Sequence, residues 1–184
     1  MSDELLVQYA SPTLAGIKTG NIFNCKFDLK EKLIAYIHHI NKCLVPKGIC
    51  VILLRLRTHS ALIYMYRPAK LKQDLGTAEA QELLKAAGYK NTKVSGCLTE
   101  LIGRLACEGN FPHEIGLFLG YPPEDVRGFI EGRKDYKCIG CWKVYGDECR
   151  AKETFARFRR CREIYRRQYA NGRSIDSLAV STGL

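Results

Sequence analysis

The chain of 184 residues is long enough to bury a core without the support of disulfides, and its 46% hydrophobic and 26% charged residues are ordinary globular usage. No stretch approaches the roughly 20 apolar residues that span a bilayer, and the acidic start Met-Ser-Asp-Glu differs from the basic start of a signal peptide. These features argue against a membrane-spanning chain and predict a cytoplasmic protein. Its net charge of +10 could serve an anionic partner or be plain solvation of a basic helix.

The first half of the chain predicts a helix followed by a β-hairpin. Residues 1–27 contain turn residues and are predicted to be irregular or to form a short strand. Apolar residues recur at helical spacing over 28–45. The runs 49–56 and 61–66 are rich in β-branched and aromatic side chains and are joined by a short polar link, which predicts an antiparallel hairpin near 49–66.

The second half predicts helices. Capping residues, prolines and glycines delimit helical patterns over residues 78–87, 95–107, 112–119, 122–131 and 147–170. The expected fold class is therefore α+β, with a small antiparallel sheet packed with helices and a mostly helical C-terminal half. We expect one domain over 1–184, with a mixed part at about 1–92 and a helical part at about 93–184, because no long polar linker intervenes.

The spacing of Gly116, Gly120 and Val126 is typical of a helix-turn-helix, which needs close helix approach and a tight turn. This pattern makes a nucleic-acid-binding protein one candidate. Arg127 is the only basic candidate for reading bases on the second short helix. Its carboxylate neighbours would repel phosphates, so at most non-specific binding is expected; they are Glu124, Asp125 and Glu131.

Nine cysteines are present, and they are expected to be free thiols or metal ligands. Cys138 and Cys141 have the spacing of a zinc knuckle or a redox pair, and Cys149 with His113 could complete a zinc site. Cys161 cannot share an ion with Cys149, because twelve helical residues separate them by roughly 18 Å. Two interpretations stay open: metal or redox chemistry at these thiols, or cysteines that pack as small apolar side chains.

A cysteine hydrolase is a weaker hypothesis. His59 lies before a predicted strand, as in some cysteine hydrolases, and Cys25 is the candidate nucleophile. However, no convincing helix N-terminus follows Cys25 that would lower the pKa of its thiol.

The last predicted helix is amphipathic and strongly basic. One side carries an apolar stripe that includes Phe155 and Tyr165, and arginines occupy most of the rest. Arginine favours phosphate and carboxylate partners, so this helix could meet nucleic acid or an acidic protein. The residues expected to contact such a partner are Arg159, Arg162 and Arg166.

Four segments also carry a resemblance: Ser11-Pro-Thr-Leu-Ala-Gly-Ile-Lys, Tyr64-Met-Tyr-Arg-Pro, Phe111-Pro-His-Glu-Ile-Gly-Leu-Phe-Leu-Gly-Tyr and Gly140-Cys-Trp-Lys-Val-Tyr-Gly-Asp. In these segments the chain resembles the uncharacterised bacterial family labelled domain of unknown function 3793. The resemblance implies a bacterial, cytoplasmic, single-domain protein and implies no activity. It also implies that Cys141, within Gly-Cys-Trp, is more general in the family than Cys138, which weakens a Cys-x-x-Cys site.

The leading hypothesis is a non-enzymatic accessory or binding protein, in which thiols could bind metal, with zinc as the candidate ion, or respond to redox state. The alternative is a helix-turn-helix nucleic-acid-binding protein. A cysteine hydrolase is the third and weaker alternative.

Overall fold

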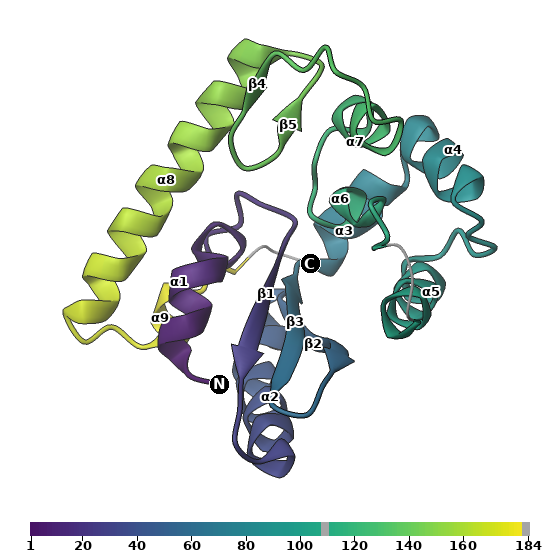
Figure 1. Cartoon of the computed structure of the whole chain (residues 1–184). Coiled ribbons are helices and arrows are strands. Elements are labelled where there is room, and N and C mark those ends of the chain that lie inside the picture. Colours follow the sequence, from purple (N-terminus) through teal and green to yellow (C-terminus); the bar gives the residue numbers. More distant parts are fainter. Residues whose placement is uncertain (108–110, 182–184) are drawn as a thin grey trace. The chain divides into compact units, whose positions relative to one another are not determined.

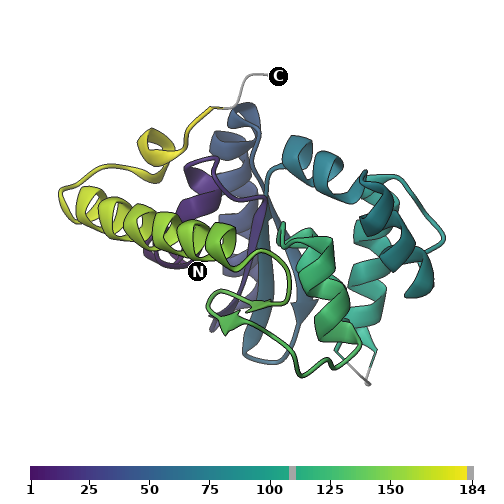
Figure 2. The same ribbon diagram turned by 90° about the horizontal axis from the view of Figure 1, so that it is seen from above.

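The computed structural model describes residues 1–107 and 111–181 (Figures 1 and 2), and the contacts within the chain divide it into two units. The first unit consists of Met1–Ala69 together with the chain from Arg160 onward, and the second consists of Lys70–Arg159. The α+β class is confirmed, because a small antiparallel sheet is accompanied by helices that dominate the C-terminal half. That the whole chain unfolds as one cooperative domain stays a prediction.

The predicted hairpin forms part of the three-stranded antiparallel sheet of the first unit. Strands β2 (Cys50–Leu56) and β3 (Ser60–Tyr66) are paired through this hairpin, with a register shift between Leu53 and Arg55. Strand β1 (Gly20–Lys26) pairs with the other edge of β3, so the strand order is β1-β3-β2. The central strand is therefore almost wholly buried, which explains why its sequence lacks polar alternation.

Helix α2 (Lys30–Leu44) covers the sheet and confirms the helix predicted over 28–45. Its apolar stripe shares one core with the buried strand residues, and this stripe is made of Leu33, Ile37, Ile40 and Leu44. The helix runs into a short 3₁₀ turn, η1 (Val45–Lys47). Asn41 fixes the return to the sheet, because its side chain both donates to and accepts from the backbone of Val51.

The prediction that residues 1–27 are irregular or short-stranded was wrong for its first half. Helix α1 (Asp3–Leu14) forms there in spite of Pro12, which lies inside it. The prediction gave too much weight to the turn residues and missed an apolar stripe at helical spacing, which is buried in the core: Leu6, Val7, Ala10 and Leu14. Tertiary burial here outweighs the weak local propensity.

The buried side chain of Arg67 links the end of α1 to the C-terminal segment of the first unit. Arg67 is only 1% exposed, and its Nε donates to the carbonyl of Thr13 at 2.7 Å. Its Nη2 donates to the carbonyls of Leu14 at 2.7 Å and Val180 at 2.8 Å, and burial lowers the pKa of the guanidinium. The C-terminal helix α9 (Ile175–Leu178) is held in the same core.

The second unit is mainly helical, and the predicted helices 78–87, 95–107 and 122–131 are confirmed within one or two residues. The helix expected over 112–119 is shorter than predicted. The elements are α3 (Pro68–Leu75), which leads into the unit, α4 (Ala78–Ala86), α5 (Val94–Ala106), α6 (Ile115–Phe118), α7 (Pro123–Ile130), β4 (Cys138–Ile139) and β5 (Lys143–Val144).

Helix α8 (Glu148–Ala170) confirms the long basic helix predicted over 147–170. Its apolar stripe is buried at Ala151, Phe155, Phe158 and Cys161, while Arg159 and Arg166 are exposed. Across the described parts of the chain, no helix combines the length and the apolar character needed to cross a membrane.

Candidate binding site

The helical corner at α6 and α7 has the close packing that its glycines predict. A Cβ added at Gly116 would lie 2.8 Å from Cγ2 of Val126, so only glycine allows this approach of the two helices. Gly120 has a φ of 74° and turns the chain between them. The predicted helical corner is therefore present, and its residues form one wall of a cavity.

The cavity has a volume of ≈ 360 Å³ and is lined by side chains of the second unit alone. We call it the aromatic cavity, because aromatic rings dominate its walls: Phe111, His113, Tyr121, Phe129 and Trp142. Aliphatic residues of α6 and α7 complete the walls, together with Asp125, Cys141 and Lys143. Its size and apolar lining are typical of small-molecule sites.

Trp142 is fixed in the wall by its neighbours. Its ring stacks on Tyr121 with 4.7 Å between centroids and meets the ring of Phe155 edge-on at 4.6 Å. The hydroxyl of Tyr121 donates to the carbonyl of Cys141 at 3.3 Å. Burial raises the pKa of Tyr121 to about 12, so this hydroxyl keeps its proton at neutral pH.

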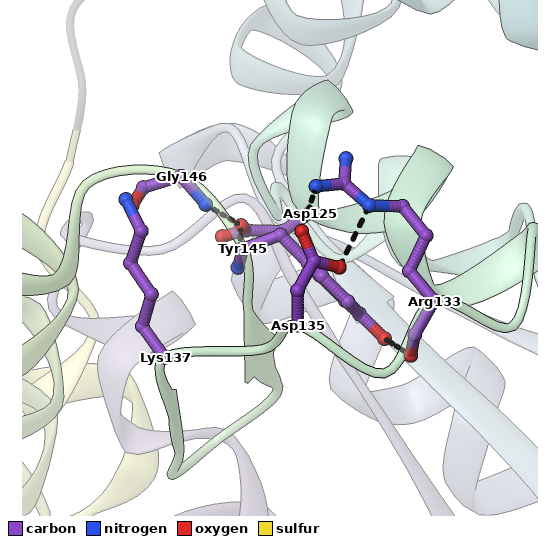
Figure 3. Close-up of polar contacts among 6 residues, drawn as sticks. All are labelled: Asp125, Arg133, Asp135, Lys137, Tyr145 and Gly146. Carbon is purple, nitrogen blue, oxygen red and sulfur yellow. Dashed lines mark hydrogen bonds and ion pairs between the residues drawn. The ribbon is translucent and has the colours of Figure 1, made fainter.

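The carboxylate of Asp125 holds the small hairpin β4–β5 against α7. Asp125 is 3% exposed, and its Oδ2 accepts a hydrogen bond from Nε1 of Trp142 at 2.6 Å. Its Oδ1 accepts from the backbone N–H groups of Tyr145 at 2.7 Å and Gly146 at 2.9 Å, and Figure 3 shows both. The expectation that Asp125 would repel phosphates beside Arg127 is therefore not supported, because its carboxylate is buried and three donors of the following loop enclose it.

The loop between α7 and β4 is held by further polar contacts (Figure 3). Arg133 forms an ion pair with Asp135, and the hydroxyl of Tyr145 donates to the carbonyl of Arg133 at 3.4 Å. Lys137 Nζ donates to the carbonyl of Gly146 at 2.5 Å. These contacts give the hairpin a defined place beside the aromatic cavity.

Lys143 places an ammonium group among aromatic rings. Its Nζ lies 5.5 Å from the ring centroid of Phe129 and 5.3 Å from that of Tyr136. Both distances are within the range of cation–π attraction. The lysine is half-buried and lines the cavity, so it supplies a positive charge at the wall.

Behind α6, a charged cluster fixes the start of that helix. Glu114 is 6% exposed, accepts a hydrogen bond from the hydroxyl of Tyr89 at 3.2 Å and lies 3.8 Å from Nη1 of Arg104. Burial and the nearby Glu114 raise the pKa of Tyr89, so Tyr89 stays a donor. Glu114 does not itself line the cavity. The cluster supports the cavity wall because it holds the start of α6, whose Ile115 and Gly116 line the cavity.

The predicted zinc ligands are not brought together as a set. Cys138 and Cys141 pack against the small core of Val144, Ala151 and Phe155, while Cys149 is exposed on α8. His113 lines the aromatic cavity with its ring edge-on to Phe129. In residues 1–107 and 111–181, no three His, Cys, Asp or Glu side chains group in a way that could hold a metal ion. The geometry therefore does not support the zinc hypothesis.

Arg127, Cys25 and His59, which were predicted site residues, are not among the residues that line the aromatic cavity. Arg127 forms an ion pair with Glu82 at 3.4 Å. The basic side chain that was expected to read bases on the second short helix is therefore already paired. Cys25 is 1% exposed on β1, where its thiol donates to the carbonyl of Lys26, and His59 lies in the exposed turn of the hairpin. The hydrolase hypothesis gains no support from these positions.

Sequence reasoning missed the residues that line the cavity. His113 and Cys141 had been singled out for metal binding, and Gly116, Asp125 and Val126 as parts of the helical corner, but none of them as the wall of a cavity. A signal was present in the single tryptophan of the chain, which stands beside Cys141 and Lys143. Apolar side chains with one adjacent charge are typical of a small-molecule site, but the sequence does not show which helices meet them.

Comparison with known proteins gives a family without an assigned role. A family model described as "Protein of unknown function (DUF3793)" matches residues 6–179. No curated protein shows a significant match to the chain. No solved structure shows one either.

Proposed function

Because the chain belongs to the DUF3793 family, whose function is unknown, its own geometry must indicate a role, and we propose that it is a binding protein for a small, mainly apolar molecule. The observation that carries this proposal is the aromatic cavity of ≈ 360 Å³. Its walls offer ring faces and aliphatic side chains, while its buried carboxylate is already engaged by three donors. Such a lining supports binding of an apolar body.

Trp142 provides a direct test, because it is the only tryptophan and it lines the cavity. A bromine atom quenches indole fluorescence on contact, so we propose 4-bromobenzyl alcohol as the probe. Saturable quenching of Trp142 would support the proposal. Quenching that rises linearly with probe concentration, as in random collision, would overturn it.

Phe129→Ala is expected to weaken binding of 4-bromobenzyl alcohol about ten-fold. Phe129 is 41% exposed, so its ring can be removed without opening the core, and the lost contact area is worth about 1.4 kcal/mol. Ile130→Ala is the matched control, because Ile130 is 43% exposed on the same helix and does not line the cavity. Equal dissociation constants for the two variants would contradict the assignment of the site.

Helix α8 supports nucleic-acid binding as a second candidate function. Its basic side chains include Arg159 and Arg166, which are exposed, and Arg162, which is half-buried. A row of arginines on one helix can contact phosphates without reading bases. The engagement of Arg127 with Glu82 favours this non-specific mode over recognition by the helical corner.

Replacing Arg159, Arg162 and Arg166 together by Gln is expected to weaken binding to every duplex sequence alike. Each phosphate contact contributes a slope of about −0.9 to the dependence of log affinity on log salt, so the slope should flatten. Fluorescence anisotropy with two unrelated duplexes at several salt concentrations measures it. Absence of binding by the parent at low salt would remove this candidate.

A further inference from the structure

We infer that the preferred occupant of the aromatic cavity is an organic carboxylate with a compact aromatic body, whose anionic group is held by Lys143. This inference rests on the proposed binding function and names the ligand class. It starts from Lys143, a wall residue whose positive charge faces a ring-lined space.

The short strand β5 fixes the direction of the lysine. Lys143 and Val144 are successive residues of β5, so their side chains point to opposite faces of the hairpin. Val144 is 0% exposed and lies in the small core with Ala151 and Phe155. Lys143 consequently points to the other face, where it lines the cavity beside Phe129.

The charge of Lys143 is not balanced by a carboxylate of the chain. Asp125 lines the same cavity, but its two oxygens accept three hydrogen bonds from Trp142, Tyr145 and Gly146. Asp135 is paired with Arg133. Over the residues that the structure describes, no acidic side chain forms an ion pair with Lys143, so a ligand anion would supply the missing countercharge.

The same position of Lys143 argues against a cationic ligand. An aromatic-walled cavity could otherwise hold an ammonium group through cation–π attraction. Here the ammonium of Lys143 already occupies the ring faces of Phe129 and Tyr136. A second cation would meet a like charge at short range, which is unfavourable.

The test uses three probes with one body: 4-bromobenzoate, 4-bromobenzyl alcohol and 4-bromobenzylammonium. Quenching of Trp142 in the full chain gives each dissociation constant. We expect the carboxylate to bind about ten-fold more tightly than the alcohol, since a partly desolvated charged hydrogen bond has about that effect. The ammonium probe should bind more weakly than the alcohol.

Variants of Lys143 separate the role of its charge from that of its bulk. Lys143→Gln should lose the ten-fold preference for the carboxylate and leave the affinity for the alcohol within about two-fold. Lys143→Arg should retain the preference. Lys134→Gln is the charge-matched control, because Lys134 is exposed in the same unit and does not line the cavity, and it should behave as the parent.

The outcomes distinguish the ligand class from the binding function. Saturable binding of the alcohol without any preference for the carboxylate would overturn the inference and leave the proposed function standing. Tighter binding of the ammonium probe, or a carboxylate preference that survives in Lys143→Gln, would also overturn the inference. Failure of all three probes to saturate would overturn both.

Discussion

An Arg67→Met variant is expected to unfold at a clearly lower urea concentration than the parent, with a loss of about 3 kcal/mol in the free energy of unfolding. Arg67 donates to the carbonyls of Thr13, Leu14 and Val180 at 2.7–2.8 Å. Methionine fills a similar volume and removes the cost of burying a charge, but it cannot donate to these carbonyls. The loss of three hydrogen bonds from a charged donor outweighs that gain, although the carbonyls of Thr13 and Leu14 keep backbone donors in Gly16 and Val180.

The control for this variant is Arg57→Met, since Arg57 is exposed in the turn between β2 and β3. A change within about 0.5 kcal/mol is expected there, as for most surface substitutions. Far-UV circular dichroism gives the unfolding curve in urea. Equal midpoints for Arg67→Met and Arg57→Met would contradict the role given to the buried guanidinium.

The same experiment tests whether the two units unfold together. Trp142 lies in the second unit and Arg67 in the first, so tryptophan emission reports on the second unit, whereas circular dichroism reports on the secondary structure of both. If the chain is one cooperative domain, Arg67→Met should lower both midpoints by the same amount. A shift of the circular dichroism curve without a shift of the Trp142 curve would show that the units unfold separately.

The elements that could be predicted from sequence are those whose local pattern agrees with their environment. Helix α2 has a clear apolar stripe, and β2 and β3 have β-branched residues around a short link, so both were predicted. Helix α1 was missed because Pro12 and nearby turn residues mask its stripe. The apolar side of α1 is buried in a core to which distant segments such as α9 contribute, and the sequence does not reveal that burial.

The candidate site was harder to predict because it depends on contacts between separate segments. The spacing of Gly116, Gly120 and Val126 correctly indicated a tight helical corner. It did not indicate that the corner bounds a cavity, because the opposite wall comes from Trp142 and Lys143 on a short hairpin. The spacing of the cysteines left metal or redox chemistry and apolar packing both open, and Cys138 and Cys141 pack against apolar side chains.

The role of Asp125 leads to the prediction with the largest expected effect on the site. An Asp125→Ala variant should lose about 3 kcal/mol or more in the free energy of unfolding. Its carboxylate accepts hydrogen bonds from Nε1 of Trp142 and from the backbone of Tyr145 and Gly146, and all three donors would lose their acceptor. Without that anchor the hairpin should loosen, and the emission of Trp142 should move to longer wavelength as water reaches its ring.

Asp125→Asn refines this prediction, because an amide has the shape of the carboxylate but only one oxygen. If that oxygen accepts from Tyr145 and Gly146, the NH₂ group faces Nε1 of Trp142, and two donors then oppose each other. The asparagine variant should therefore fall between the parent and Asp125→Ala in stability, with a red-shifted Trp142 emission and weaker quenching by 4-bromobenzyl alcohol. Glu131→Gln removes the same charge at an exposed position of the same segment and should leave all three measurements unchanged. Parent-like emission and quenching in Asp125→Asn would show that Trp142 is held by its aromatic neighbours alone, since its stacking on Tyr121 and its edge contact with Phe155 do not involve the carboxylate.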